Sequence, residues 1–188
     1  MRVLTQSDVS QILSVVRSYS PRRPVRAIYR PGTGIEPILL DLGEILDFAS
    51  FEPGDPGEFL GLPVHVSVGE VSFVGDPLGH ECSSLLYSLI IASTGEGISV
   101  DLSGDLAVMV TTSCPFCPYQ VSLAMKMAQG TPGLRAFVVV LDAVEGGPEL
   151  AKALDINAVP ATFLFRGEER IGPVVGTTSL ERLLSALG

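Results

Sequence analysis

Short apolar runs separated by turn-forming residues fill the second half of the chain. Residues 106–110 and 136–141 are uninterrupted apolar stretches, of the kind that lie buried on both faces of a sheet. Between them, apolar side chains recur at helical spacing, which predicts a helix with a left-handed C-terminal cap at Gly130. This stretch therefore predicts a strand, a helix and a second strand.

The remaining pattern predicts a helix, a hairpin and a closing helix. A mixed central sheet with helices on its faces follows from that order, so the fold class is α/β. The expected elements are a helix opened by Pro148 and running through Leu154, strands over 162–165 and 170–171 around a turn at Gly167, and a helix with a capping box at 178–181 that ends near Leu187.

The C-terminal part of the first half resembles the C-terminal part of the second half. Residues 62–68 and 71–74 alternate or run apolar around a Gly-Glu turn, and a helix is expected from about Pro77 to Ala92. Leu62-Pro63 opens this hairpin as Val159-Pro160 opens the later one. An internal repeat is therefore predicted, with units at 1–98 and 99–188.

Upstream, the two halves differ in length. If 25–29 matches 106–110 and 37–41 matches the strand ending at 141–142, about 20 residues are absent from the first copy, roughly the length of a helix. The first unit is therefore expected to be degenerate, with Arg30-Pro-Gly-Thr-Gly34 in place of that helix. An unrelated N-terminal domain with a chance proline is the alternative.

Charge is unevenly spread. Residues 1–30 hold six arginines against Asp8 alone, a sum of +5, whereas the rest of the chain sums to −14. A capping box at Thr5–Asp8 and helical apolar spacing from Val9 to Val16 predict a folded first helix, and a removable targeting segment is the alternative. Because the rest of the chain is acidic, the arginines predict a solvated surface in preference to a nucleic-acid patch.

Composition bounds the class of protein. Hydrophobic residues make up 46% of the chain, enough for a buried core, yet no run approaches the roughly 18 apolar residues of a membrane-spanning helix. Three cysteines, an odd and low number, argue against a secreted disulfide scaffold and for a reducing, cytoplasmic location.

Two of these cysteines stand where thiol chemistry is favoured. Cys114 and Cys117 open the helix that follows the 106–110 strand, and a helix N-terminus stabilises a thiolate. Cys114, expected to be exposed, is the predicted nucleophile, and Cys117, one turn further in, the resolving thiol. Pro115 presets the first helical turn, and Phe116 offers an apolar surface for a protein substrate.

A second element supports this interpretation. Val159-Pro160 precedes a strand, where a cis proline leaves the Val159 backbone free to pair with an extended substrate beside Cys114. Substrate-binding residues are therefore predicted at Pro115, Phe116, Val159 and Pro160. A CxxC that opens a helix, followed about 45 residues later by Val-Pro before a hairpin, is a specific combination.

These residues carry a family resemblance. Residues 113–119, SCPFCPY, resemble the active-site segment of glutaredoxin-type thioredoxin-fold proteins. With GDPLGHE at 75–81, the whole chain resembles the protein disulfide oxidoreductases of archaea and thermophilic bacteria, which contain two tandem thioredoxin-like units. The resemblance implies a thiol–disulfide oxidoreductase without a bound cofactor. It also implies an electron donor that is a flavin-dependent thioredoxin reductase-like protein or glutathione, and substrates that are proteins with disulfides or thiols.

The chain departs from that family in two places. The first unit has no CxxC, which also makes it similar to the N-terminal domain of the flavoprotein that reduces alkyl hydroperoxide peroxiredoxins, and implies an electron-transfer module feeding a peroxiredoxin as the alternative function. Thioredoxins place a buried acid about six residues before the nucleophile, where this chain has Val108. Proton transfer from Cys117 would then need water or another carboxylate.

Other functions remain open at this stage. A zinc site could combine Cys114 and Cys117 with His80 and Cys82, but His80-x-Cys82 in a helix start points its side chains apart, so no metal is expected. A redox-inactive docking module is the third class. Cys82 is expected to be a small buried apolar residue, and His65 a structural one.

Overall fold

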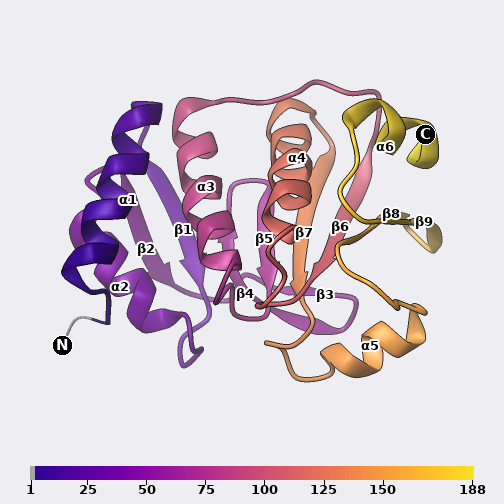
Figure 1. Cartoon of the computed structure of the whole chain (residues 1–188), viewed down its shortest axis with the longest axis horizontal. Helices are drawn as coiled ribbons and strands as arrows, with labels where there is room; N and C mark the ends of the chain where they lie inside the picture. Colours follow the sequence, from indigo (N-terminus) through magenta and orange to yellow (C-terminus); the bar gives the residue numbers. More distant parts are fainter. Residues whose placement is uncertain (1–2) are drawn as a thin grey trace.

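A computed structural model describes residues 3–188 as one mixed sheet with helices packed against it (Figure 1). The helices are α1 (Gln6–Tyr19), α2 (Glu36–Ile45), α3 (Glu81–Thr94), α4 (Cys117–Gly130), α5 (Gly147–Ala153) and α6 (Leu180–Leu187). The strands are β1 (Val25–Tyr29), β2 (Ala49–Pro53), β3 (Glu58–Phe59), β4 (Leu62–Val68), β5 (Val71–Val74), β6 (Gly104–Val110), β7 (Leu134–Val140), β8 (Ala161–Arg166) and β9 (Glu169–Val175).

The strand order repeats one pairing scheme. It runs β2-β1-β4-β5-β7-β6-β8-β9, with β3 paired to β4. In the first half β1 pairs parallel with β2 and antiparallel with β4, and in the second half β6 pairs parallel with β7 and antiparallel with β8. The halves join through the parallel pair β5–β7, so one continuous sheet carries both.

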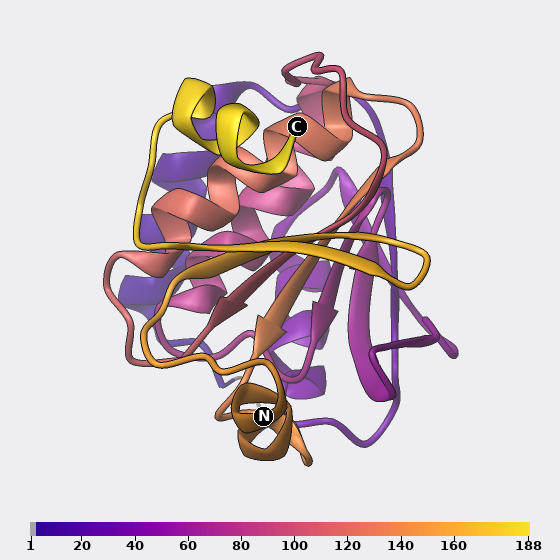
Figure 2. The same cartoon turned by 90° about the vertical axis from the view of Figure 1, so that its right-hand side faces the viewer.

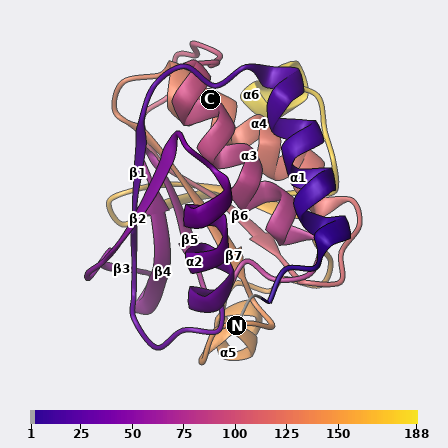
Figure 3. The same ribbon diagram turned by 90° about the vertical axis from the view of Figure 1, so that its left-hand side faces the viewer.

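Two apolar cores lie on opposite faces of the sheet. The larger packs α1, α2, α3, α4 and α6 against it, and Figure 3 shows α1, α3 and α4 to one side of β1–β4. The smaller lies on the other face around Phe59 and Phe163, where residues of α5 join it. Figure 2 shows α5 at one end of the sheet, away from α4 and α6. Residues 106–110 of β6 alternate between the two cores, which explains why all five are apolar.

Most predicted elements of the second half are confirmed, with two corrections at helix ends. Gly130 is the last residue of α4 and does not form a left-handed cap, because Thr131 ends the helix in extended conformation. The closing helix is capped by Ser179, whose side chain accepts a hydrogen bond from the Arg182 N–H, and not by Thr178. The first helix and its capping box at Thr5–Asp8 are as predicted.

The predicted strand over 37–41 is wrong, and with it the missing helix of the first half. These residues lie in α2, and β2 follows at 49–53. Pro37 sits in the first helical turn, and the buried Ile35, Leu39 and Leu42 are spaced along one helical face. A short apolar run cannot by itself be assigned to helix or strand, which is why the pattern misled. The helix of 77–92 likewise begins later, at Glu81.

Gly130 has a packing role that gives a stability prediction. A Cβ there would lie 2.4 Å from the Ile98 nitrogen and 2.5 Å from the Ile98 carbonyl carbon, both backbone atoms. We expect Gly130→Ala to lower the free energy of unfolding by about 3 kcal/mol in chemical denaturation, as overpacking does. Gly43→Ala in α2 meets only the Phe51 side chain at 3.4 Å and is expected to gain up to about 1 kcal/mol. Equal effects of the two substitutions would contradict this packing account.

Candidate functional site

The two cysteines form a disulfide where β6 passes into α4. The Cα atoms of Cys114 and Cys117 are 5.5 Å apart, and α4 begins at Cys117. Cys117 is fully buried, and Cys114 is only 8% exposed in the disulfide, so the expectation that Cys114 is exposed is corrected. Pro115 and Phe116 take the exposed positions between the two buried cysteines.

The residues of α4 do not neutralise the partial positive charge at its N-terminus. No side chain caps it, and its first turn contains no acidic residue. Its unpaired N–H groups and the aligned peptide dipoles therefore leave partial positive charge beside Cys114 and Cys117. This arrangement favours a thiolate over a thiol once the disulfide is reduced.

Val159 and Pro160 lie beside this helix start. The Val159–Pro160 peptide bond is cis, and β8 pairs with β6 through Ala161 and Met109. Extending that register by one residue places Pro160 opposite Val110, four residues before Cys114. No hydrogen bond to the Val159 backbone is found within residues 3–188, so its N–H and C=O are available to an added strand.

Hydrogen bonds from two other elements hold the loop before Cys114. The Thr112 N–H donates to Asp142 Oδ1 at 2.9 Å, and its hydroxyl donates to Asp142 Oδ2 at 2.7 Å. The Thr112 carbonyl accepts from the His80 N–H at 2.9 Å. The N-terminus of α3 is thereby attached directly to the loop that carries the cysteines.

Glu81 is a buried carboxylate that the sequence reasoning did not select. It is the first residue of α3 and fully buried, on the same helical face as Ser84, Leu85 and Ser88. Neither carboxyl oxygen has a hydrogen-bond partner in the described part of the chain. Burial, the larger influence, raises its pKa to about 7, whereas the neighbouring Ser84 acts to lower it. Figure 1 shows α3 and α4 side by side, and the hydrogen bond from the His80 N–H to Thr112 places the start of α3, where Glu81 follows His80, beside the loop that carries Cys114.

In the first half, the start of α2 is occupied by the side chain of Asp76. Asp76 accepts hydrogen bonds from the Gly34 N–H at 2.9 Å and the Ile35 N–H at 3.2 Å, at the start of α2. His65, predicted to be structural, lies 2.8 Å from Asp76 through Nδ1. Burial would raise the pKa of Asp76, but the contacts with His65 and the two N–H groups together lower it. An ionised carboxylate therefore fills the anion-favouring end of α2.

Strand register corrects the predicted match between the two hairpins. Tyr29, at the end of β1, is paired with Val66 of β4, whereas Pro63 pairs with Glu58 of β3. On the sequence match of Tyr29 to Val110, this register sets Val66, and not Pro63, against Pro160. The cis bonds of the described chain are at Val159–Pro160 and Gly172–Pro173.

The remaining sequence candidates do not form a second site. No cluster of three or more His, Cys, Asp or Glu side chains able to hold a metal occurs between residues 3 and 188, so His80 and Cys82 do not complete a zinc site with the CxxC. Cys82 is a free, half-buried thiol and not a fully buried one; burial first and Glu81 second raise its pKa.

Two of the N-terminal arginines pair with acidic side chains. Arg26 pairs with Glu52, and Arg30 donates to Asp55 at 2.6 Å, so acidic side chains offset them. Arg2 lies outside the described residues. Among the helices of residues 3–188, none has the length and apolar character needed to cross a bilayer.

Comparison with solved structures establishes the fold. The chain is 20% identical to the NTD_N/C domain of alkylhydroperoxide reductase AhpF from Enterococcus faecalis, with a TM-score of 0.76 over 98% of this chain and 100% of that one. A protein disulfide oxidoreductase from Aeropyrum pernix is 19% identical, with a TM-score of 0.69 over 98% and 93%. A Sulfolobus solfataricus protein is 15% identical, with a TM-score of 0.57 over 87% and 97%. No protein-family model and no curated protein matches the sequence. The fold is thus thioredoxin-like, with a disulfide at a CxxC.

Proposed function

We propose that the chain is a thiol–disulfide oxidoreductase that acts on protein disulfides through a dithiol–disulfide cycle of Cys114 and Cys117. The observation that carries the proposal is the placement of this disulfide at the uncapped start of α4, beside the unpaired backbone of Val159. The helix start favours the attacking thiolate, and the backbone offers a place for the substrate chain.

The reductive direction proceeds in two exchanges. The Cys114 thiolate attacks one sulfur of the substrate disulfide, whose bond breaks and releases the other sulfur as a thiolate. The substrate lies along Val159 and Pro160, with Pro115 and Phe116 against its apolar side chains. The Cys117 thiolate then attacks the Cys114 sulfur, releases the second substrate thiolate and leaves the protein pair oxidised. Two electrons pass to the substrate, and two protons from the protein and solvent complete its thiols.

Glu81 is the proposed acceptor for the proton that Cys117 loses. Its side chain is fully buried, where water has little access, and a pKa of about 7 suits proton exchange near neutral pH. It follows His80, whose N–H bonds the Thr112 carbonyl two residues before Cys114. It would replace the acid that thioredoxins carry at the position of Val108. The same carboxyl would return the proton when the pair is reduced again.

We further propose two tandem thioredoxin-like units, at 1–98 and 99–188, of which the first is redox-inactive. The repeated strand pairing supports this division. With Tyr29 matched to Val110, Thr33 and Glu36 stand where the second unit has Cys114 and Cys117. Because Asp76 fills the start of α2, the first unit is proposed to serve docking and stability.

The proposed cycle needs no bound cofactor, because the cysteine pair itself stores the two electrons. A flavin-dependent thioredoxin reductase-like protein or glutathione is the proposed donor, and the cytoplasm, where thiols are kept reduced, is the proposed location. An electron-transfer module that feeds a peroxiredoxin is the second candidate. The likeness to the AhpF domain, which extends over all of that chain, favours it.

Trapping of mixed disulfides tests the cycle. Cys117→Ser keeps the attacking thiol and removes the resolving one, so covalent adducts with substrate proteins are expected to persist and to be released by dithiothreitol. Non-reducing electrophoresis of proteins captured from cells of the source organism measures them. The control is the double variant Cys114→Ser/Cys117→Ser, expected to trap none; equal capture by both proteins would contradict the resolving role.

A further inference from the structure

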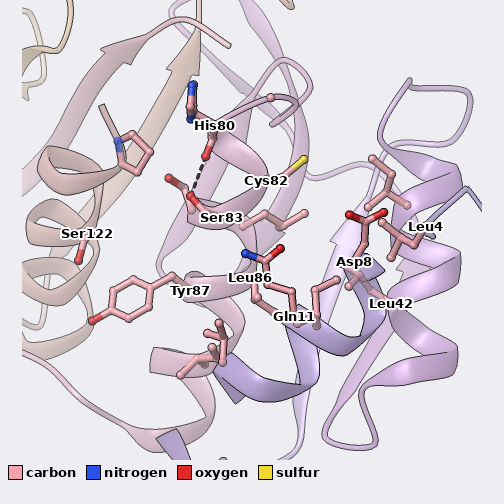
Figure 4. Close-up of a pocket in the computed structure, with 18 of the residues that line it drawn as sticks. Leu4, Asp8, Gln11, Leu42, His80, Cys82, Ser83, Leu86, Tyr87 and Ser122 are labelled. Carbon is pink, nitrogen blue, oxygen red and sulfur yellow. Dashed lines mark hydrogen bonds between the residues drawn. The ribbon is translucent and has the colours of Figure 1, made fainter. Parts of the chain in front are cut away.

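A long groove leads away from the redox pair across the helical face. Its floor is α3, its far wall is α1 with part of α2, and its near wall is the first two turns of α4. The cavity has a volume of about 900 Å³. Figure 4 shows Tyr87 pointing from α3 toward Ser122 of α4, with Asp8 and Gln11 on the opposite side. We call this the α1–α4 groove.

One end of the groove is part of the redox site. Pro115 and Pro118, which flank Cys117 in the sequence, line it, and so does Tyr119, whose side chain is 71% exposed. At the same end, His80 lines the floor and its N–H bonds Thr112, two residues before Cys114. The α1–α4 groove and the surface around Cys114 are therefore continuous.

The far wall is held at both ends. The Val3 and Leu4 N–H groups donate to Asp41 of α2 at 2.7 and 2.8 Å. After α1, the N–H groups of Arg22 and Arg23 donate to the Ser93 hydroxyl of α3, each at 3.1 Å. Between these anchors only Val16 of α1 is buried, and Val15, on the groove, is 39% exposed. Hydrogen bonds thus attach the chain to α2 before α1 and to α3 after it, and the groove lies between these two attachments.

The lining combines apolar side chains with one negative charge. Apolar residues such as Ile12 of α1, Leu42 of α2 and Leu86 of α3 face it. Asp8 is the one acidic residue of the lining, and hydrogen bonds from Thr5 lower its pKa, so it is ionised at neutral pH. No Lys or Arg lines the groove within residues 3–188. An apolar segment that carries a positive charge complements this surface.

We propose that the α1–α4 groove binds the segment of a substrate protein that adjoins its redox cysteine, and that it selects segments rich in apolar residues with a lysine or arginine opposite Asp8. The inference rests on the proposed function, because a protein disulfide over Cys114 sends its chain away in two directions, and Val159 accounts for only one. With 14 residues, α3 is about 21 Å long, so the groove has room for about six residues of extended chain.

Peptide substrates of defined flanks test the proposal. Each peptide carries one cysteine as a mixed disulfide with thionitrobenzoate, followed or preceded by six residues. The Cys114 thiolate attacks the peptide sulfur and releases the coloured aromatic thiolate, which is the better leaving group; Cys117 then releases the peptide thiol and leaves the pair oxidised. We expect kcat/KM for Leu/Val-rich flanks with one lysine to exceed that for Gly/Ser flanks at least tenfold, and a lysine-to-glutamate change in the peptide to lose several-fold.

Variants of the far wall test whether the advantage of the apolar peptide arises in the groove. Val15→Arg is expected to remove most of the advantage of the apolar peptide. Leu40→Arg is the matched control, because Leu40 lies on α2, is 55% exposed and does not line the groove, so that protein is expected to keep the advantage. A small disulfide, 5,5′-dithiobis(2-nitrobenzoate), does not reach Val15 and reports the redox pair alone.

A footprint provides an independent readout. Cys82 lines the floor of the groove and its thiol is free. In the mixed disulfide trapped with Cys117→Ser, the apolar peptide is expected to slow alkylation of Cys82 at least fivefold relative to the Gly/Ser peptide. Equal protection by both peptides would contradict occupancy of the groove.

The remaining outcomes separate the two proposals. Equal rates for all peptides, or an advantage that survives Val15→Arg, would overturn the groove as a substrate site while leaving the cysteine cycle intact. A dimer in light scattering that Val15→Arg dissociates would assign the groove to a second copy of this chain. No reaction even with the small disulfide would contradict the proposed function itself, and this inference with it.

Discussion

Replacing Cys114 with serine abolishes the acceleration of insulin reduction by dithiothreitol. A serine hydroxyl is not ionised at neutral pH and cannot form the mixed disulfide, so the rate is expected to fall at least about 100-fold, to that of the reagent alone. The turbidity of precipitating insulin chains measures it. This is the largest effect that the account predicts, because neither other thiol can replace Cys114. Cys117 is fully buried, and the pKa of Cys82, in the first turn of α3, is raised by burial and by Glu81.

Cys82→Ser is the matched control for that experiment. It removes the third thiol of the chain without touching the pair, so full acceleration of insulin reduction is expected. If Cys114→Ser and wild type reduce insulin at equal rates, the chain is a docking module and its disulfide is structural. If Cys82→Ser is as inactive as Cys114→Ser, the reactive sulfur has been assigned to the wrong helix.

Glu81→Gln changes how stability depends on pH. Burial raises the pKa of Glu81 to about 7 in the folded protein, against about 4.5 when unfolded. The folded state therefore holds the proton more tightly, and the free energy of unfolding falls as pH rises from about 4.5 through 7. A shift of this size corresponds to about 3 kcal/mol, fully lost by pH 8. A glutamine cannot ionise, so the variant is expected to lack this loss.

Denaturant unfolding at pH 5 and pH 8 measures the effect. Wild type is expected to lose about 3 kcal/mol more between these pH values than Glu81→Gln does. Glu145→Gln, the same change at an exposed position, controls for the removal of one negative charge. In the catalytic cycle, Glu81→Gln is expected to slow release of substrate from the mixed disulfide near neutral pH. Parallel stability profiles for wild type and Glu81→Gln would place the carboxyl in water and end its proposed role.

Sequence patterns predicted the structure correctly where it depends on local chemistry alone. The capping box at Thr5–Asp8, the apolar strand 106–110 and the placement of Cys114 and Cys117 at a helix start needed only local chemistry. The strand proposed at 37–41 failed because its apolar run suits a helix as well as a strand, and Pro37 was not recognised as a helix-opening residue. Local pattern therefore predicted the second half better than the first half.

Features that depend on long-range contacts could not be predicted. Glu81 looks like an ordinary first-turn acid in the sequence, and only the packing of α3 shows that it is fully buried without a hydrogen bond. The filling of the α2 start by Asp76 joins residues about 40 positions apart. The match of Val66 to Pro160 comes from strand register, and the α1–α4 groove from the positions of three helices.

The most direct test of the account is the pH dependence of alkylation of the reduced protein, followed at Cys114 by mass spectrometry. The account predicts that Cys114 reacts with a midpoint well below that of an ordinary thiol, because the start of α4 stabilises its thiolate. Cys82, whose pKa burial raises, serves as the internal reference and is expected to react with a midpoint above the ordinary value. A Cys114 that titrates like a free thiol, or that the reagent cannot reach at any pH, would contradict the claim that this cysteine is the nucleophile.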